Sequence, residues 1–75
     1  MNNIRRKRLK IAKEMLENAK EIIQDVMEEE QDCFDNLSEG LQQTARGEQM
    51  ENNVDEMNDC IDSIDEAISS LENVE

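Results

Sequence analysis

The amino-acid sequence predicts an all-α protein folded as a long antiparallel two-helix hairpin of the coiled-coil type. The 75 residues include no proline and only two glycines, so little in the chain interrupts a helix. Apolar residues recur at helical spacing through two long segments. The turn-forming residues Asn36, Ser38 and Gly40 gather between those segments, which indicates one connection.

The first helix is predicted over residues 2–34, and its apolar residues fall into two adjoining stripes. One stripe, with spacings of three and four, contains Leu9, Ala12, Leu16, Ala19, Ile23 and Val26. The other, with alternating spacings of seven and four, contains Ile4, Ile11, Met15, Ile22, Val26 and Cys33. Seven plus four is an 11-residue repeat, the period of a nearly straight helix. Together the stripes span roughly 160° of the helix, so we expect this helix to contact two neighbours.

Residues 35–44 are predicted to form the connection, with room for one short helical turn. Thr44 is the expected N-cap of the second helix, because its hydroxyl can accept a hydrogen bond from an unpaired backbone N–H. The second helix is predicted over residues 45–74. Its apolar residues alternate spacings of four and three, as in a coiled coil, and are Met50, Val54, Met57, Ile61, Ile64, Ile68 and Leu71. A flanking row at a spacing of seven contains Cys60, Ala67 and Val74.

The short connection predicts that the two helices lie antiparallel within a single domain, residues 1–75. Facing residue numbers would then add up to about 80. This register places the basic start of the chain opposite the acids near residue 75. We therefore expect Arg5 or Arg8 to form an ion pair across the hairpin. The expected acceptors are Glu72 and Glu75.

The two cysteines, Cys33 and Cys60, are too few to indicate a disulfide framework, so a reducing cytoplasm is the expected location. In the predicted hairpin they lie about 20 Å apart. That separation excludes an intrachain disulfide. Both cysteines are interpreted as small buried apolar residues.

Two helices cannot cover all of this apolar surface. Each covers one stripe of the other, and the remaining stripes would form a patch larger than soluble monomers usually expose. The simplest remedy is a homodimer with two-fold symmetry, in which two hairpins form a four-helix bundle. The predicted oligomer or partner interface consists of Ile11, Met15, Ile22, Val26, Met57, Ile61, Ile64, Ile68 and Leu71.

Composition argues against catalysis, a cofactor and a metal site. The chain has no histidine, the usual general base and commonest metal ligand. It also lacks a glycine-rich phosphate loop. No apolar run approaches the roughly 20 residues that span a bilayer. No continuous apolar stretch follows the basic start, so neither a membrane partner nor a secretory signal is expected.

The net charge of −12 is unevenly distributed along the chain. Residues 1–13 carry six bases and no acid, whereas residues 14–75 carry all 20 acids and two bases. The start of the chain forms a basic patch of Arg5, Arg6 and Arg8. The second helix forms an acidic face of Asp55, Asp59, Asp62, Asp65 and Glu66.

These patterns support one leading hypothesis and two alternatives. The leading hypothesis is a non-enzymatic interaction module that self-associates, or binds a host protein, through its apolar stripe. The first alternative is an acidic mimic of nucleic acid, because carboxylates along a rigid helix can occupy a basic groove on another protein. The second is a nucleic-acid binder through the basic patch. An intramolecular charge match is the preferred interpretation of that patch, because the chain is acidic overall and its only aromatic residue, Phe34, is not available there for base stacking.

Three segments carry a resemblance to a known group of proteins. They are the opening Asn-Asn-Ile-Arg-Arg-Lys-Arg-Leu, the central residues 34–42 and the closing residues 61–72. They resemble small helical-hairpin proteins of bacteriophages and mobile elements of Gram-positive bacteria, in which a proline often stands at the position of Ser38. The resemblance implies a phage or prophage origin and a location in the host cytoplasm. Since small phage proteins often counter host defence, it extends to a role as a defence inhibitor.

Overall fold

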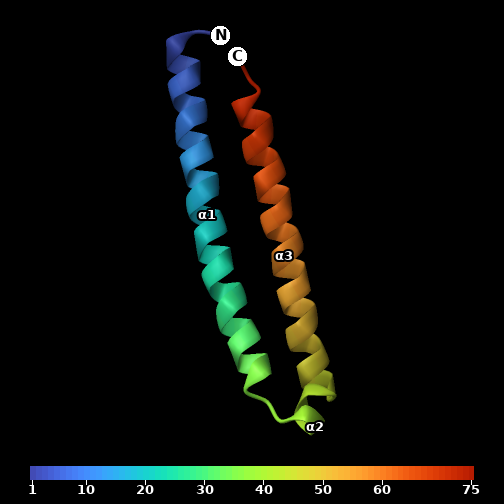
Figure 1. The fold of residues 1–75 in the computed structure, drawn as a ribbon. Coiled ribbons are helices and arrows are strands. Elements are labelled where there is room, and N and C mark those ends of the chain that lie inside the picture. The colour runs from blue at the N-terminus through green and yellow to red at the C-terminus, as the bar shows by residue number, and fades with distance from the viewer.

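The computed structural model describes all 75 residues and confirms the all-α hairpin. Its helices are α1 (Asn3–Asp35), α2 (Glu39–Gln42) and α3 (Ala45–Glu72). Helices α1 and α3 lie side by side and antiparallel, so the two chain termini meet at one end, while α2 lies at the other (Figure 1). The bounds of the long helices differ from those predicted by at most two residues.

Each helix begins at a polar residue that caps it. The side chain of Asn2 accepts a hydrogen bond from the backbone N–H of Arg5, and Ser38 does the same for Leu41 in α2. Thr44 accepts from the backbone N–H of Gly47 at 3.4 Å, which confirms it as the N-cap of α3. These caps satisfy donors that a helix start otherwise leaves unpaired.

The connection is fixed by close contacts to the backbone. The side-chain amide of Gln42 donates to the carbonyls of Phe34 and Leu37, at 3.1 and 3.2 Å, and so closes the C-terminal end of α1. Gly47 is buried, and a Cβ placed there would overlap the backbone of Gln42. The absence of a side chain at Gly47 therefore lets the end of α2 rest directly against the first turn of α3.

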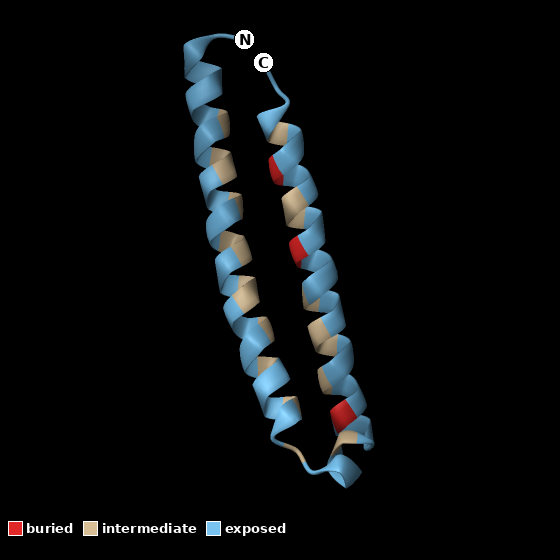
Figure 2. Ribbon diagram, in the orientation of Figure 1, coloured by how far each residue is buried: buried red, intermediate tan, exposed pale blue.

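The packed surface between α1 and α3, here called the seam, consists of apolar side chains on the facing sides of the two helices. Ile61 and Ile68 of α3 are its buried residues. The half-buried apolar residues that line the rest of the seam are Leu9, Ala12, Leu16, Ala19, Ile23, Met27 and Phe34 of α1 and Met50, Val54, Met57, Ile64 and Leu71 of α3. Figure 2 shows this burial confined to the facing sides of the two helices. The seam therefore contains the heptad stripe of α3 and the first predicted stripe of α1, except for Val26, which is 46% exposed.

The hairpin is long and thin, with principal extents of 58 × 15 × 12 Å. Its radius of gyration is 17.2 Å, whereas a compact 75-residue domain would have about 11 Å. Its accessible surface is 5826 Å², whereas a compact monomer of 8.7 kDa would expose about 4,700 Å². A chain of this size usually needs a disulfide, a metal or oligomerisation to be stable.

The register of the hairpin differs from the predicted one. Side-chain pairs across the seam join Lys13 to Glu72, Lys20 to Asp65, and Glu30 to Asn53. Their residue numbers add up to 83–85. The prediction was about 80, so α3 is displaced toward the connection by somewhat more than one helical turn. The cause is the connection, because its extended backbone and α2 carry the chain past the end of α1 before α3 begins (Figure 1).

We predict that Gly47→Ala lowers the free energy of unfolding by about 1–3 kcal/mol, because the new methyl group must push α2 away from α3. Gly40→Ala is the matched control. A Cβ at Gly40 meets nothing within 4 Å, and alanine favours the helix by up to about 1 kcal/mol. Urea unfolding followed by circular dichroism, at one fixed protein concentration, measures both. Equal effects of the two substitutions would contradict the close approach at Gly47.

Candidate interaction surface

The second predicted stripe of α1 faces solvent along its whole length. We call it the outer stripe, and it consists of Ile4, Ile11, Met15, Ile22, Val26 and Cys33. Its five large apolar residues are between 46% and 71% exposed. Spacings of seven and four keep these residues on one side of α1, adjacent to the side that packs in the seam. The hairpin therefore leaves one of the two predicted stripes uncovered.

Helix α3 extends this apolar surface. A shallow groove joins the helices on the side of the outer stripe, and its apolar lining comes from Ile22, Ile23 and Val26 of α1 and from Met57 and Cys60 of α3. Ala67, two helical turns beyond Cys60 on the same side of α3, is also exposed. We call this combined surface the apolar face: the outer stripe together with Cys60 and Ala67.

The interpretation of the cysteines as buried residues is wrong for this hairpin. Cys33 and Cys60 are both free and exposed. Each stands on the apolar face, because the spacings that relate it to its apolar neighbours place it outside the seam. The spacing places both cysteines among apolar neighbours, but the hairpin leaves those neighbours exposed.

The nine residues predicted for the interface divide between two surfaces. Ile11, Met15, Ile22 and Val26 lie on the outer stripe and are exposed. Met57 borders the groove and is half-buried. The remaining four face α1, with Ile64 and Leu71 half-buried and Ile61 and Ile68 buried. Most of the heptad stripe of α3 is thus occupied within the hairpin, and α1 supplies the larger share of the available surface.

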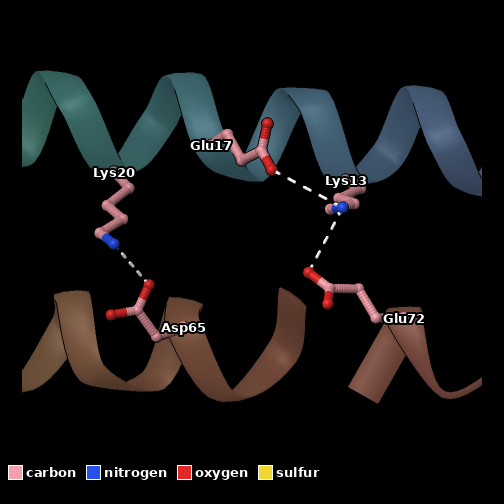
Figure 3. Close-up of polar contacts among 5 residues, drawn as sticks. All are labelled: Lys13, Glu17, Lys20, Asp65 and Glu72. Carbon is pink, nitrogen blue, oxygen red and sulfur yellow. Dashed lines mark ion pairs between the residues drawn. The ribbon is translucent and has the colours of Figure 1, made fainter. Parts of the chain in front are cut away.

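The opposite flank of the hairpin is polar. Lys20 Nζ lies 2.6 Å from Asp65 Oδ1, and Lys13 Nζ lies 3.3 Å from Glu72 Oε1 and 4.0 Å from Glu17 Oε1 (Figure 3). Lys20 is two residues from Ile22, which places the two side chains roughly 200° apart around α1. The ion pairs therefore line one flank of the seam, and the apolar face occupies the other.

The predicted ion pair between Arg5 or Arg8 and the acids near the C-terminal end is not formed. Neither arginine takes part in any of the three ion pairs. The displaced register explains this, because Glu72 lies level with Lys13 and the first turns of α1 extend past the end of α3 (Figure 1). The pairs of Lys13 and Lys20 were not predicted from the sequence, although the helical phase of both lysines beside Leu16 places them next to the seam.

Near the connection, polar side chains cross the seam on the same side as the outer stripe. Asn53 Nδ2 donates to Glu30 Oε2 at 2.8 Å, and Gln49 Nε2 donates to Asn53 Oδ1 at 2.9 Å. Glu30 follows Val26 by one turn of α1. The groove between the helices therefore ends here, and beyond it only α1 continues the apolar face, through Cys33.

The predicted acidic face lies away from the apolar face, whereas Arg8 of the basic patch lies beside Ile4 and Ile11 at one end of it. Arg5, Arg6 and Arg8 are exposed at the end of the hairpin where the termini meet. Four members of the predicted acidic face are exposed on α3: Asp55, Asp59, Asp62 and Glu66. The fifth, Asp65, is half-buried and paired with Lys20. The acidic face is thus largely solvated.

No group of three or more cysteine and carboxylate side chains is arranged to hold a metal ion. No helix is both long enough and apolar enough to span a membrane.

Comparison with family models, curated proteins and solved structures finds no match to this chain. The resemblance to phage proteins therefore stays a prediction from the sequence.

We predict that Lys20 and Asp65 are energetically coupled by about 0.2–1 kcal/mol in a double-mutant cycle, since the pair is partly exposed. The cycle uses Lys20→Gln and Asp65→Asn and measures free energies of unfolding. The coupling should fall at high salt because exposed charges are screened. Arg8 with Glu72 is the control and should show none. Equal coupling in both cycles would contradict the observed register.

Proposed function

We propose that this protein is a non-enzymatic interaction module that self-associates through its apolar face, forming a homodimeric four-helix bundle. The observation that carries the proposal is the uncovered outer stripe of α1. It runs from Ile4 to Cys33, nearly the full length of the helix. Soluble monomers rarely expose a contiguous apolar surface of this kind unless it is an interaction site.

The surface area of the hairpin supports the proposal. The accessible surface of 5826 Å² exceeds that of a compact monomer of the same mass by about 1,100 Å². A standard protein interface buries about 800 Å² on each partner. The excess surface is therefore large enough to supply one complete interface.

A second copy fits the apolar face better than a globular partner of limited extent. The face is straight and follows a hairpin 58 Å long. A partner that covers it must present an apolar surface of similar length, and the same face of another copy does so. Pairing of two hairpins in this way gives the four-helix bundle, an arrangement in which each helix buries two sides.

One observation supports a second candidate function, binding of a polyanion such as nucleic acid through the basic patch. Arg5 and Arg8 have no intramolecular carboxylate partner, so the charge match that would have neutralised them is missing. Binding that weakens steeply with salt, and is lost in Arg5→Gln with Arg8→Gln, would support this function. The phage origin, the cytoplasmic location, the role against host defence and the acidic mimicry stay predictions from the sequence.

The mass in solution tests the self-association. We expect light scattering at micromolar concentration to give twice the chain mass of 8.7 kDa. Met15→Glu and Ile22→Glu should each weaken the dimer at least about 100-fold, because an unpaired carboxylate in a closed interface costs several kcal/mol. Both residues are exposed in the hairpin, so the fold of each chain should survive.

Leu41→Glu is the matched control for these substitutions. Leu41 is 54% exposed but lies in α2, outside the apolar face. The variant should keep the dimer mass. A wild-type protein that stays at the monomer mass across the micromolar range would overturn the proposed function.

A further inference from the structure

The spacing of the outer stripe is symmetric about its own centre. Its successive intervals are 7, 4, 7, 4 and 7 residues, which read the same in both directions. The midpoint falls between Asn18 and Ala19. The residues that stand at equal distances from this midpoint are Ile4 with Cys33, Ile11 with Val26, and Met15 with Ile22.

This symmetry matches one particular way of packing two copies. When two α1 helices lie antiparallel about a two-fold axis at the midpoint, each residue of the outer stripe is level with its counterpart on the other helix. All six residues then meet an apolar side chain of the second copy. A pairing shifted by two residues in either direction would place charged or polar side chains opposite most of them. A shift of one residue would place opposite most of them either polar side chains or residues such as Leu16, Ile23 and Met27, which already pack in the seam.

The distribution of charge also favours antiparallel packing of the two copies. The half of the hairpin that holds the termini, residues 1–21 and 64–75, carries seven bases and seven acids. The loop half, residues 22–63, carries one base and 13 acids, so the whole net charge of −12 resides there. Packed helices lie about 8–10 Å apart. This distance is comparable to the screening length of about 8 Å at physiological salt, so charges on two packed copies still interact.

Two arrangements with a two-fold axis can bring the apolar faces together. With the axis along the hairpin, both loop halves would lie side by side and repel each other. With the axis across the hairpin, each acidic loop half lies beside a neutral half of the other copy. The second arrangement also places Arg8 level with Glu29 of the second copy, which gives the unpaired arginine an opposite charge.

Helix α3 is compatible with this axis. In the observed register, the midpoint of the outer stripe is level with residues 66–67 of α3, as the pairs Lys13–Glu72 and Lys20–Asp65 show. Ala67 stands there, on the exposed side. Its small side chain lets the two α3 helices approach each other where the axis passes between them.

We propose that the second copy binds in the reversed direction, with α1 packed antiparallel on α1 about a two-fold axis between Asn18 and Ala19. This inference rests on the proposed self-association and specifies its geometry. Ile4 of each copy then contacts Cys33 of the other. Within one chain these two positions lie roughly 43 Å apart along α1, so they cannot meet.

A directed disulfide tests the direction. In a Cys60→Ser background, Ile4→Cys leaves thiols at positions 4 and 33 only. Mild oxidation of this variant should give a covalent dimer in high yield, because the two thiols of different copies are level. Cys60→Ser alone, and the variant that adds Cys33→Ser to the pair of substitutions, are the controls. Both should remain uncrosslinked, since their remaining thiols lie at opposite ends of the bundle.

A distance measurement separates failure of the direction from failure of the dimer. With spin labels on Cys33 in the Cys60→Ser background, the reversed arrangement predicts a separation of about 40–45 Å. The arrangement with both loop halves together predicts about 15 Å. A dimer with the short distance and no crosslink would overturn the reversed direction while leaving the proposed function intact. A monomer mass would overturn both proposals.

Discussion

A single layer of two helices has no enclosed interior, and this constraint shapes the whole molecule. Each helix can bury only the side that faces its neighbour, so the seam supplies just two buried apolar side chains, Ile61 and Ile68. The 11-residue repeat of α1 provides apolar residues for a second side as well. The outer stripe therefore stays exposed, because one hairpin covers only one of the two apolar sides of α1.

The two flanks of the seam differ in chemistry, because one carries ion pairs and the other carries apolar side chains. On one flank, Lys13 and Lys20 join α1 to acids of α3 and hold the register, although such exposed pairs contribute only about 0–1 kcal/mol each. On the other flank, α1 presents large apolar side chains next to Cys60 and Ala67. Because polar and apolar residues segregate in this way, a partner can cover the apolar face without disturbing the ion pairs.

Periodicity in the sequence was sufficient to predict the helices, the seam and the existence of an outer stripe, because those features depend on helical phase alone. The register was not predictable, because it depends on how the connection folds. That fold rests on two backbone-level contacts, the amide of Gln42 on the end of α1 and the close approach at Gly47. The error in register also accounts for the missing arginine pairs, since Glu72, one of the expected acceptors, lies level with Lys13 and not with Arg5 or Arg8. The cysteines were misjudged because apolar spacing does not distinguish a covered face from an open one.

The interface inferred for α1 combines two properties that a sequence would not need for a hairpin alone. The 7-4 repeat makes the stripe symmetric about its centre, and an antiparallel pair of identical helices uses that symmetry, because it sets apolar residues of the two copies level with one another. The concentration of acids in the loop half also favours the antiparallel arrangement, because it disfavours the one in which the two loop halves lie side by side. The basic residues at the start of α1 then have a role that the single chain does not give them. They lie where the reversed second copy brings its acidic residues, so apolar contact and charge select one arrangement together.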